Sequence, residues 1–337
     1  MADRYWVGGT ATWDASTTSV WSTTSGGSGG ASVPTSSDNV YFDQAGTYTV
    51  TVDANPAYCA NFTVSASNYT FSTGAGYFQI AGNLALASGT VWNISNFYFI
   101  ATSGTYTITT NGTALKIINF GISATTATWS MQDALTFTSI NSLKGTLNTN
   151  GYNITGNGIG GGSASGSRTI NMSTSQITLS SGGNAAWSNI LGLTWSPGAN
   201  ITFTSTNGNS LTLRSLSFPP VTFTGAGTVT INSNNTFANF SCTYVGAKTF
   251  QFTAGTTNTF IAFNLRGTAG NLYTITSTTT SAATLNKAGT WYMGANSTDS
   301  GNNTGLTFAA GSGIDYLNVS YITGTAVAVT ANFLGLM

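Results

Sequence analysis

Short segments that alternate apolar and polar residues follow one another from about residue 40 to the C-terminus. Each is about three to six residues long and ends at a Gly or Asn turn, the pattern of β-strands bounded by turn residues. No stretch shows the apolar period or the cap of a helix. We therefore predict an all-β chain, with strands and the turn residues that end them in 47–53, 68–72, 77–80, 83–89, 105–112, 134–139, 200–208, 221–232 and 248–255.

The composition supports the same class. Hydrophobic residues make up 41% of the 337 residues and charged residues only 5%, which is the opposite of a disordered chain. Polarity comes from Thr, Ser, Asn and Gly, which disfavour helices because they compete for backbone hydrogen bonds or cost backbone entropy. Thr, Val, Ile and the aromatic residues suit the half-buried surface of a sheet.

Two all-β architectures fit many short strands: a parallel β-solenoid (β-helix) and tandem β-sandwich domains. The strand pattern runs for about 300 residues without an obvious boundary, whereas a β-sandwich domain has about 100 residues. Only five prolines occur, and recurrent Thr, Ser and Asn side chains can form ladders between stacked rungs. We predict a β-solenoid with rungs of roughly 22 residues, and keep tandem sandwiches as the alternative.

Three regions are expected along the chain. Residues 1–45 are predicted to form a Trp-rich N-terminal cap, residues 46–290 the β-helical body, and residues 291–337 a C-terminal loop with apolar strands for attachment or oligomerisation. The Gly- and Ser-rich stretch at 156–167 is either a long turn leaving the solenoid or a separator of two β-domains. Its G-x-G-x-x-G pattern lacks the following helix and acidic residue of a dinucleotide site, which favours a flexible loop.

Three of the eight tryptophans, Trp6, Trp13 and Trp21, precede the first clear rung. Exposed, they would form a platform that stacks on sugar rings; buried, they would plug one end of the fold. The end of a solenoid exposes its core and has to be covered by atypical sequence. We therefore favour a structural cap made of these three residues.

Catalytic and metal chemistry has few candidate residues. The chain has no histidine and no glutamate, which excludes Ser-His-Asp and Cys-His arrangements and His-based metal sites. Of the eight aspartates, Asp43 and Asp53 are the best pair for glycoside hydrolysis, which needs two neighbouring carboxylates. Both are more simply explained as turn or strand-end residues. We expect no enzymatic activity and no cofactor.

The charge pattern bears on possible partners. Net charge is zero, and the eight Lys and Arg residues are spread singly, whereas nucleic-acid binding needs basic clusters. No apolar stretch is long enough for a membrane-spanning helix, and the start lacks the apolar region of a secretory signal. We expect neither nucleic-acid binding nor membrane insertion. Cys59 and Cys242 lie in strand-like settings where a free thiol acts as a small hydrophobe.

A run of three aromatic residues, Phe97, Tyr98 and Phe99, stands out in the body. Successive strand residues face opposite sides, so at least one ring points outward unless both faces are covered. Such a ring stacks on sugars or fills a subunit interface. We favour core or interface over glycan contact for these residues, because aromatic residues are enriched at interfaces.

Several segments at both ends of the chain resemble sequences of known families. "ATWDASTTSVWS" followed by "VPTSSDNVYFDQAGTYTVTVD" and "CANFTVS" resembles the opening of β-helical autotransporter-passenger-like sequences. "RYWVGGTATWD", "TFQFTAGTTNTFIAFNLRGTAGNLYTITS" and "WYMGANSTDSGNNTG" together look like a family of structural proteins of tailed bacteriophages. The resemblance covers both ends, about a third of the chain, and departs from the family at Leu306, where an aromatic residue is more usual. It implies a virion fibre, spike or capsid decoration.

These observations lead to one expected function and two alternatives. We expect a non-enzymatic bacteriophage virion structural protein that forms a surface appendage, fibre or capsid decoration, assembles in the host cytoplasm and is exposed on the particle. Its expected partners are further copies of itself, with a trimer as one option, and other virion proteins. The alternatives are a carbohydrate-binding receptor module or tailspike that recognises host surface glycans, and a subunit of an extracellular filament.

Overall fold

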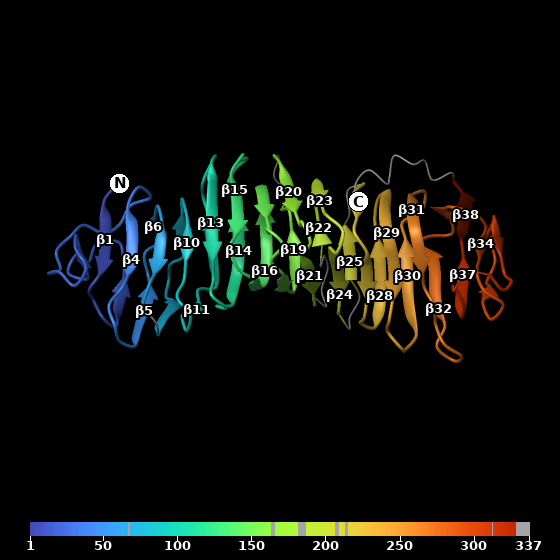
Figure 1. Ribbon diagram of the computed structural model, residues 1–337, viewed down its shortest axis with the longest axis horizontal. Coiled ribbons are helices and arrows are strands. Elements are labelled where there is room, and N and C mark those ends of the chain that lie inside the picture. Colours follow the sequence, from blue (N-terminus) through green and yellow to red (C-terminus); the bar gives the residue numbers. More distant parts are fainter. Residues whose placement is uncertain are drawn as a thin grey trace. The chain divides into compact units, whose positions relative to one another are not determined.

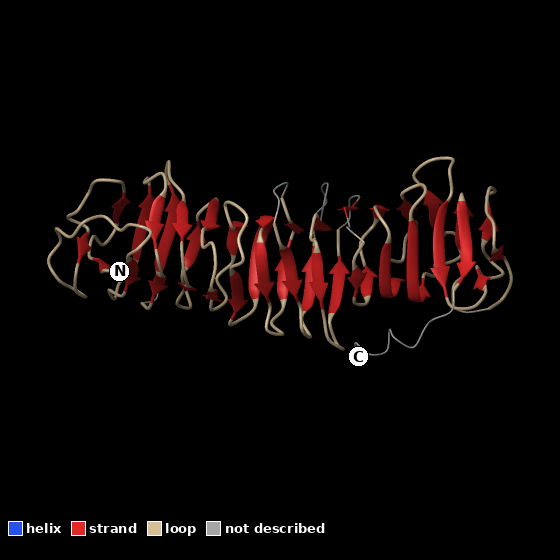
Figure 2. Cartoon of the chain, turned by 90° about the horizontal axis from the view of Figure 1, so that it is seen from above, coloured by secondary structure: helices blue, strands red, loops and turns tan. Residues whose placement is uncertain are grey.

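A computed structural model describes residues 1–66, 68–162, 166–180, 187–205, 209–212, 215–311 and 313–327. Every regular element in these ranges is a β-strand, and the strands stack in parallel as a β-solenoid (Figures 1 and 2). This confirms the predicted fold class over the tandem-sandwich alternative, whose sheets would be antiparallel. The chain divides into two compact units, Met1–Gly156 with Gly161–Asn171, and Asn157–Gly160 with Met172–Met337.

Unit 1 contains three sheets. Sheet 1 has β3 (Trp21–Ser22) at one edge, antiparallel to its neighbour β1 (Asp3–Trp6). The parallel strands of sheet 1 are β1, β4 (Asn39–Phe42), β7 (Phe62–Val64), β10 (Leu84–Ala85), β13 (Thr105–Thr109), β15 (Thr128–Met131), β17 (Gly145–Asn148) and β20 (Arg168–Asn171). Sheet 2 consists of β2 (Ala11–Trp13), β5 (Tyr48–Val52), β8 (Tyr69–Thr73) and β11 (Val91–Asn93). Sheet 3 consists of β6 (Ala57–Cys59), β9 (Phe78–Ile80), β12 (Asn96–Phe99), β14 (Leu115–Phe120) and β16 (Leu135–Leu143), and β18 (Ile154–Gly156) pairs with β16.

Unit 2 contains two long parallel sheets. One has β19 (Gly158–Gly160), β22 (Trp187–Ser188), β25 (Asn209–Thr212), β28 (Gly227–Ile231), β30 (Lys248–Phe252), β32 (Tyr273–Ser277), β37 (Leu317–Ser320) and β35 (Thr298–Asp299). The other has β21 (Gln176–Leu179), β24 (Asn200–Phe203), β26 (Ser217–Phe218), β27 (Val221–Phe223), β29 (Asn235–Cys242), β31 (Thr257–Asn264), β33 (Ala283–Lys287) and β38 (Ile322–Ala326). β34 (Trp291–Tyr292) pairs with β36 (Leu306–Thr307), and β23 (Gly192–Thr194) also belongs to this unit.

One turn of the solenoid takes about 22 residues, as the sequence pattern predicts. In sheet 1 the register partners in successive strands are Val40, Phe62, Leu84, Ile108 and Met131. All five side chains are buried, because alternate residues of a strand point to the same face and these face the interior. Each inward-facing position of a strand therefore belongs to a column of buried register partners that runs through successive turns, as the period-two pattern of the sequence predicts.

Aromatic rings fill much of this core. In unit 1 the Phe42 ring lies 5.3 Å from the Phe62 ring and 4.8 Å from the Phe71 ring, centroid to centroid. In unit 2 the Phe240 ring lies among aromatic rings as Phe42 does in unit 1, with its centroid 5.4 Å from those of both Phe250 and Phe260. Several of these pairs are edge-to-face, an arrangement that adds stability beyond the burial of apolar area.

Two sequence-based expectations need correction. The predicted strand at 221–232 is two strands, β27 and β28, separated by a corner at Gly225. A Cβ atom on Gly225 would lie 1.6 Å from the carbonyl oxygen of Ser205, so only glycine allows this approach of the backbone. The predicted loop at 156–167 is also partly wrong, because Gly156 ends β18 and Gly158–Gly160 form β19. Its residues 163–165 lie outside the described residues.

The structure also places strands in the predicted terminal regions. β1 already pairs in parallel with β4, both ahead of residue 46, so parallel stacking extends into the segment predicted as a cap. In the C-terminal region β37 and β38 lie within the two predicted apolar strands, while residues 328–337 of that prediction lie outside the described residues. The boundaries of the three regions stay predictions.

Candidate functional site

The three N-terminal tryptophans lie together in the core of unit 1. Trp6, Trp13 and Trp21 have no exposed surface. The Trp21 ring lies edge-on to Trp6 at 5.1 Å and to Trp13 at 4.8 Å between centroids, and the Trp6 indole N–H donates to the carbonyl of Gly9 at 2.9 Å. None of the three presents a ring face on which a sugar can stack.

Trp13 and Trp21 come from strands at the edges of their sheets, and Trp6 comes from β1, the strand next to the edge of sheet 1. β2, which carries Trp13, is the last strand of sheet 2, and β3 (Trp21–Ser22) is the last strand of sheet 1. β3 runs antiparallel to β1, with Trp21 opposite Trp6. This placement supports the interpretation of the three residues as a cap, since terminal rungs need atypical sequence over their exposed core.

The aromatic run at 97–99 divides between the two faces of β12. Phe97 and Phe99 are fully buried; Phe97 packs edge-on against Trp92, and Phe99 stacks on Phe120 with centroids 5.1 Å apart. Tyr98 lies between them on the outer face and is half-buried. The alternation of a strand therefore assigns two rings to the core and one to the surface.

Tyr98 belongs to a group of aromatic and amide side chains on the outer face of sheet 3. Tyr58 of β6, Gln79 of β9 and Tyr98 of β12 are register partners in successive strands. The Tyr77 ring lies 5.4 Å from the Tyr98 ring, and Asn96 donates its amide N–H to the Tyr98 hydroxyl at 3.0 Å. We call these five residues the tyrosine strip. Tyr58 is its most accessible ring, 36% exposed.

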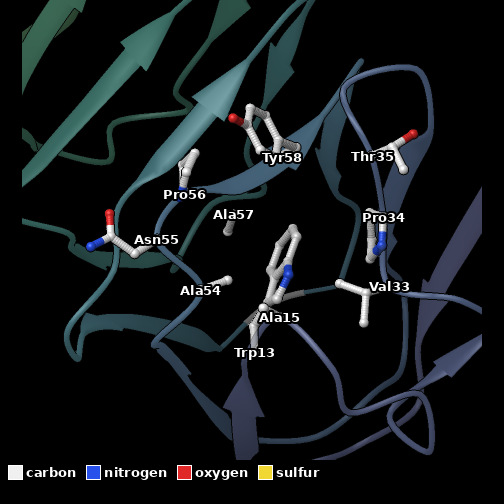
Figure 3. A pocket seen from close by; sticks show the side chains of 10 residues that line it. All are labelled: Trp13, Ala15, Val33, Pro34, Thr35, Ala54, Asn55, Pro56, Ala57 and Tyr58. Carbon is white, nitrogen blue, oxygen red and sulfur yellow. The ribbon is translucent and has the colours of Figure 1, made fainter.

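A pocket of about 480 Å³ lies next to Tyr58 (Figure 3). Figure 3 shows the indole ring of Trp13 standing between the segment at residues 54–58 and the segment at residues 33–35. The lining residues are uncharged: Trp13, Ala15, Val33, Pro34, Thr35, Ala54, Asn55, Pro56, Ala57 and Tyr58. The pocket therefore lies between Trp13 and the tyrosine strip, which it adjoins through Tyr58.

The indole ring of Trp13 is fully buried behind the surface of this pocket. The Trp13 indole nitrogen is buried and has no acceptor among the described residues. A buried N–H without an acceptor costs free energy relative to one that is paired. In Figure 3 this nitrogen faces the side of Val33 and Pro34.

The aspartates near this region hold turns together. Asp14 accepts hydrogen bonds from the Thr17 side chain and from the backbone N–H groups of Ser16 and Thr17, and these bonds lower the pKa of Asp14 to about 2. Burial, the largest influence on Asp38, raises its pKa, but hydrogen bonds from Thr35 and Ala2 outweigh it and the pKa is lowered.

Asp43 and Asp53, the candidate catalytic pair, also accept hydrogen bonds from neighbouring groups of the chain. Asp53 accepts the backbone N–H of Ala75 at 2.8 Å, one turn along the solenoid, while Asp43 accepts the side-chain amide of Gln44 at 2.6 Å. Each carboxylate therefore has a structural partner of its own. Within the described residues no cluster of three or more His, Cys, Asp or Glu side chains is arranged to hold a metal ion.

Comparisons with known proteins did not identify a similar protein. No protein-family model matches the chain, and neither the curated proteins nor the solved structures that were searched contain a match. None of the described residues forms a helix of the length and apolarity needed to cross a membrane. The function has to be argued from the solenoid and its surface.

Unit 2 contains a buried amine that the sequence does not single out. Lys248 donates from Nζ to the carbonyl oxygens of Gly225 at 2.6 Å and Ala226 at 3.1 Å, one turn earlier. Nζ also lies 5.8 Å from the centre of the Phe223 ring. Burial lowers the pKa of this amine. Its position indicates a structural clamp on the corner between β27 and β28.

Both cysteines are free. Cys59 is buried and Cys242 is half-buried. Burial raises the pKa of the Cys59 thiol, so this side chain acts as a small apolar core residue.

Most of the tyrosine strip was not predicted from the sequence, in which only Tyr98 stood out. Tyr58, Tyr77 and Gln79 are unremarkable in the linear sequence and become neighbours of Tyr98 only when the turns are aligned. The available signal was a recurrence of outward polar or aromatic residues at about 20-residue intervals, the length of one rung.

Proposed function

We propose that this chain is a non-enzymatic structural protein of a bacteriophage virion, serving as a surface appendage, fibre or capsid decoration. The phage assignment is supported by the resemblance of its N-terminal and C-terminal segments. The structural role is supported by the β-solenoid, in which each rung is bonded to its neighbours through the backbone. Such a body provides stiffness without a catalytic centre.

The observation that carries the structural role is a ladder of side chains that repeats the backbone bonding between rungs. Asn39 donates to Asp3 at 2.9 Å, and Asn61 donates to Asn39 at 2.7 Å. The Asn61 side-chain oxygen accepts the N–H of Asn83, whose own side-chain oxygen accepts the N–H of Thr107. Four successive hydrogen bonds therefore link five neighbouring strands of sheet 1. They run along the direction in which the rungs stack, which is the direction in which a fibre would bear tension.

Assembly on the particle is the second part of the proposal. A neutral surface with few charges offers little electrostatic repulsion between copies, which favours close packing of identical subunits into a homo-oligomer. We assign attachment to residues 291–337 because the sequence is unusually apolar from residue 314 onward, and an apolar segment left exposed is a liability. Further copies of the chain and other virion proteins are the proposed partners.

Immunogold electron microscopy tests the assignment. Antibodies raised against the purified protein are applied to phage particles from a culture whose virion peptides, identified by mass spectrometry, include this chain. Gold on the tail or capsid surface is the expected result. Gold confined to filaments that carry no phage heads would instead establish the extracellular-filament alternative and overturn the proposal.

A further inference from the structure

We propose that the pocket beside Tyr58 and the tyrosine strip together form a binding site for a neutral oligosaccharide. This role goes beyond the proposed structural function and does not depend on it. The site lies wholly within unit 1, on β6, β9 and β12 and the segments at residues 33–35 and 54–58.

The first argument is the shape of the site. The pocket has a volume of about 480 Å³, within the usual range for sites that take small ligands. One wall is Tyr58, which also begins the strip formed with Tyr77 and Tyr98. A ligand with one unit in the pocket therefore continues along aromatic rings on the sheet. A chain of linked sugar rings has this form.

The second argument is the chemistry of the lining. Aromatic rings supply apolar faces while their polar edges take hydrogen bonds, and the pyranose ring of a sugar has one apolar face surrounded by hydroxyl groups. Asn55 and Thr35 are exposed at the pocket, and the amides of Gln79 and Asn96 alternate with the rings of the strip. The amides of Asn55 and Gln79 offer both donors and acceptors, which hydroxyl groups require. The Thr35 hydroxyl donates to Asp38 and the Asn96 amide donates to Tyr98.

The absence of charge sets the ligand class. All ten pocket-lining residues and all five residues of the tyrosine strip are uncharged. Sulfated sugars and nucleic acids are recognised mainly through Lys and Arg, and neither the pocket lining nor the tyrosine strip contains one. The occupant is therefore a neutral saccharide.

The scaffold holds these groups in place before the ligand arrives. Tyr58, Gln79 and Tyr98 stand on three adjacent strands whose backbones are bonded in register, and Asn96 fixes the Tyr98 hydroxyl. Sites built on strands are more exact than sites on loops, and they lose less entropy on binding.

The test measures binding of defined probes to the full chain. Maltohexaose, cellohexaose, mannohexaose and the hexamer of N-acetylglucosamine serve as neutral probes, with a sulfated heparin hexasaccharide and a proline-rich peptide for comparison. We expect at least one neutral probe to bind by isothermal titration calorimetry. Y58A and Y98A should each weaken its Kd by about ten-fold, because each removes a stacking ring, while Y58F should keep affinity within about three-fold.

A matched variant separates the site from general effects of losing a surface tyrosine. Tyr152 is also in unit 1, is 42% exposed and lies outside the strip and the pocket lining, so Y152A should bind like the wild type. Thermal unfolding checks that each variant is folded. The proposal is overturned if no neutral probe binds, if only the sulfated probe or the peptide binds, or if Y152A weakens binding as much as Y58A. None of these results would alter the virion assignment.

Discussion

The side-chain amide of Asn61 donates to the side-chain oxygen of Asn39 across 2.7 Å, although the two residues are 22 positions apart in the sequence. The same Asn61 oxygen accepts the backbone N–H of Asn83, a further 22 positions on. One side chain thus bonds to the turn before it and the turn after it. Asparagine suits this position because its amide is both donor and acceptor.

Replacing Asn61 with Ala should lower the free energy of unfolding by about 1–3 kcal/mol, because the change breaks two bonds and leaves partly buried partners unpaired. Denaturant unfolding followed by circular dichroism measures the loss. The control is N93A, which changes an exposed asparagine at the edge of sheet 2. Equal stability of N61A and N93A would mean that the ladder contributes nothing beyond the backbone bonds.

Replacing Trp13 with Ala should destabilise the protein by about 3–5 kcal/mol, since the change removes a fully buried ring and leaves a cavity beside Trp21. Thermal or chemical unfolding reports the change, and Y152A again provides a surface control. A W13A protein with unchanged stability would show that the capping role assigned to this ring is wrong.

Acid should weaken the turn at Asp14. Its pKa in the folded state is about 2 against an ordinary value of 3.8. The carboxylate therefore stabilises the fold fully above pH 3.8, and this contribution disappears as the pH falls through about 2. The thermal midpoint, measured from pH 5 down to pH 2, should fall less in D14N than in the wild type over this window. Parallel curves for the two proteins would contradict the assignment.

Salt should have little effect on stability. Only 5% of the residues are charged, and positive and negative charges are equal in number, so few Coulombic interactions are available for screening. The thermal midpoint is expected to change little between about 20 mM and about 1 M sodium chloride. Because sodium chloride has only a small effect on apolar burial, a large shift would point to charge pairs as a main source of stability.

The buried amine of Lys248 should contribute more to the free energy of unfolding than the amine of an exposed lysine. K248M keeps most of the side-chain volume but removes the donor to the carbonyls of Gly225 and Ala226, and we expect a loss of about 1–3 kcal/mol. K116M, at an exposed position of β14, should be close to neutral. If K248M is as stable as the wild type, the corner between β27 and β28 does not depend on this clamp.

Much of the fold followed from local pattern. Residues 47–53 alternate as a strand, and β5 occupies most of that stretch; Phe97 to Phe99 divide between core and surface as alternation requires. The break at Gly225 was missed because it depends on Ser205, a residue of the preceding turn. Contacts between turns are invisible to a pattern that considers only neighbours in sequence.

The tyrosine strip was missed for a related reason. Turn length varies along the solenoid: register partners lie 24 residues apart between Leu84 and Ile108 but 18 apart between Trp129 and Leu147. Without a fixed repeat, the sequence does not show that Tyr58 and Tyr98 share a column. The burial of Trp13 was equally undetermined, because a ring between Gly, Thr and Ser residues suits a cap or a sugar platform.

The edge strand β3 ends sheet 1 in the direction opposite to that of its neighbour β1. The backbone edge of a parallel solenoid is a template onto which another rung running the same way can be added, from the same chain or from another molecule. At β3 the edge strand runs the other way, and the Gly- and Ser-rich residues that follow it do not continue the pattern. The carbonyl oxygen of Trp21 also accepts the backbone N–H groups of Gly30 and Ala31 at 3.0 Å. The segment after β3 therefore occupies part of the edge at which a strand of another molecule could pair with sheet 1.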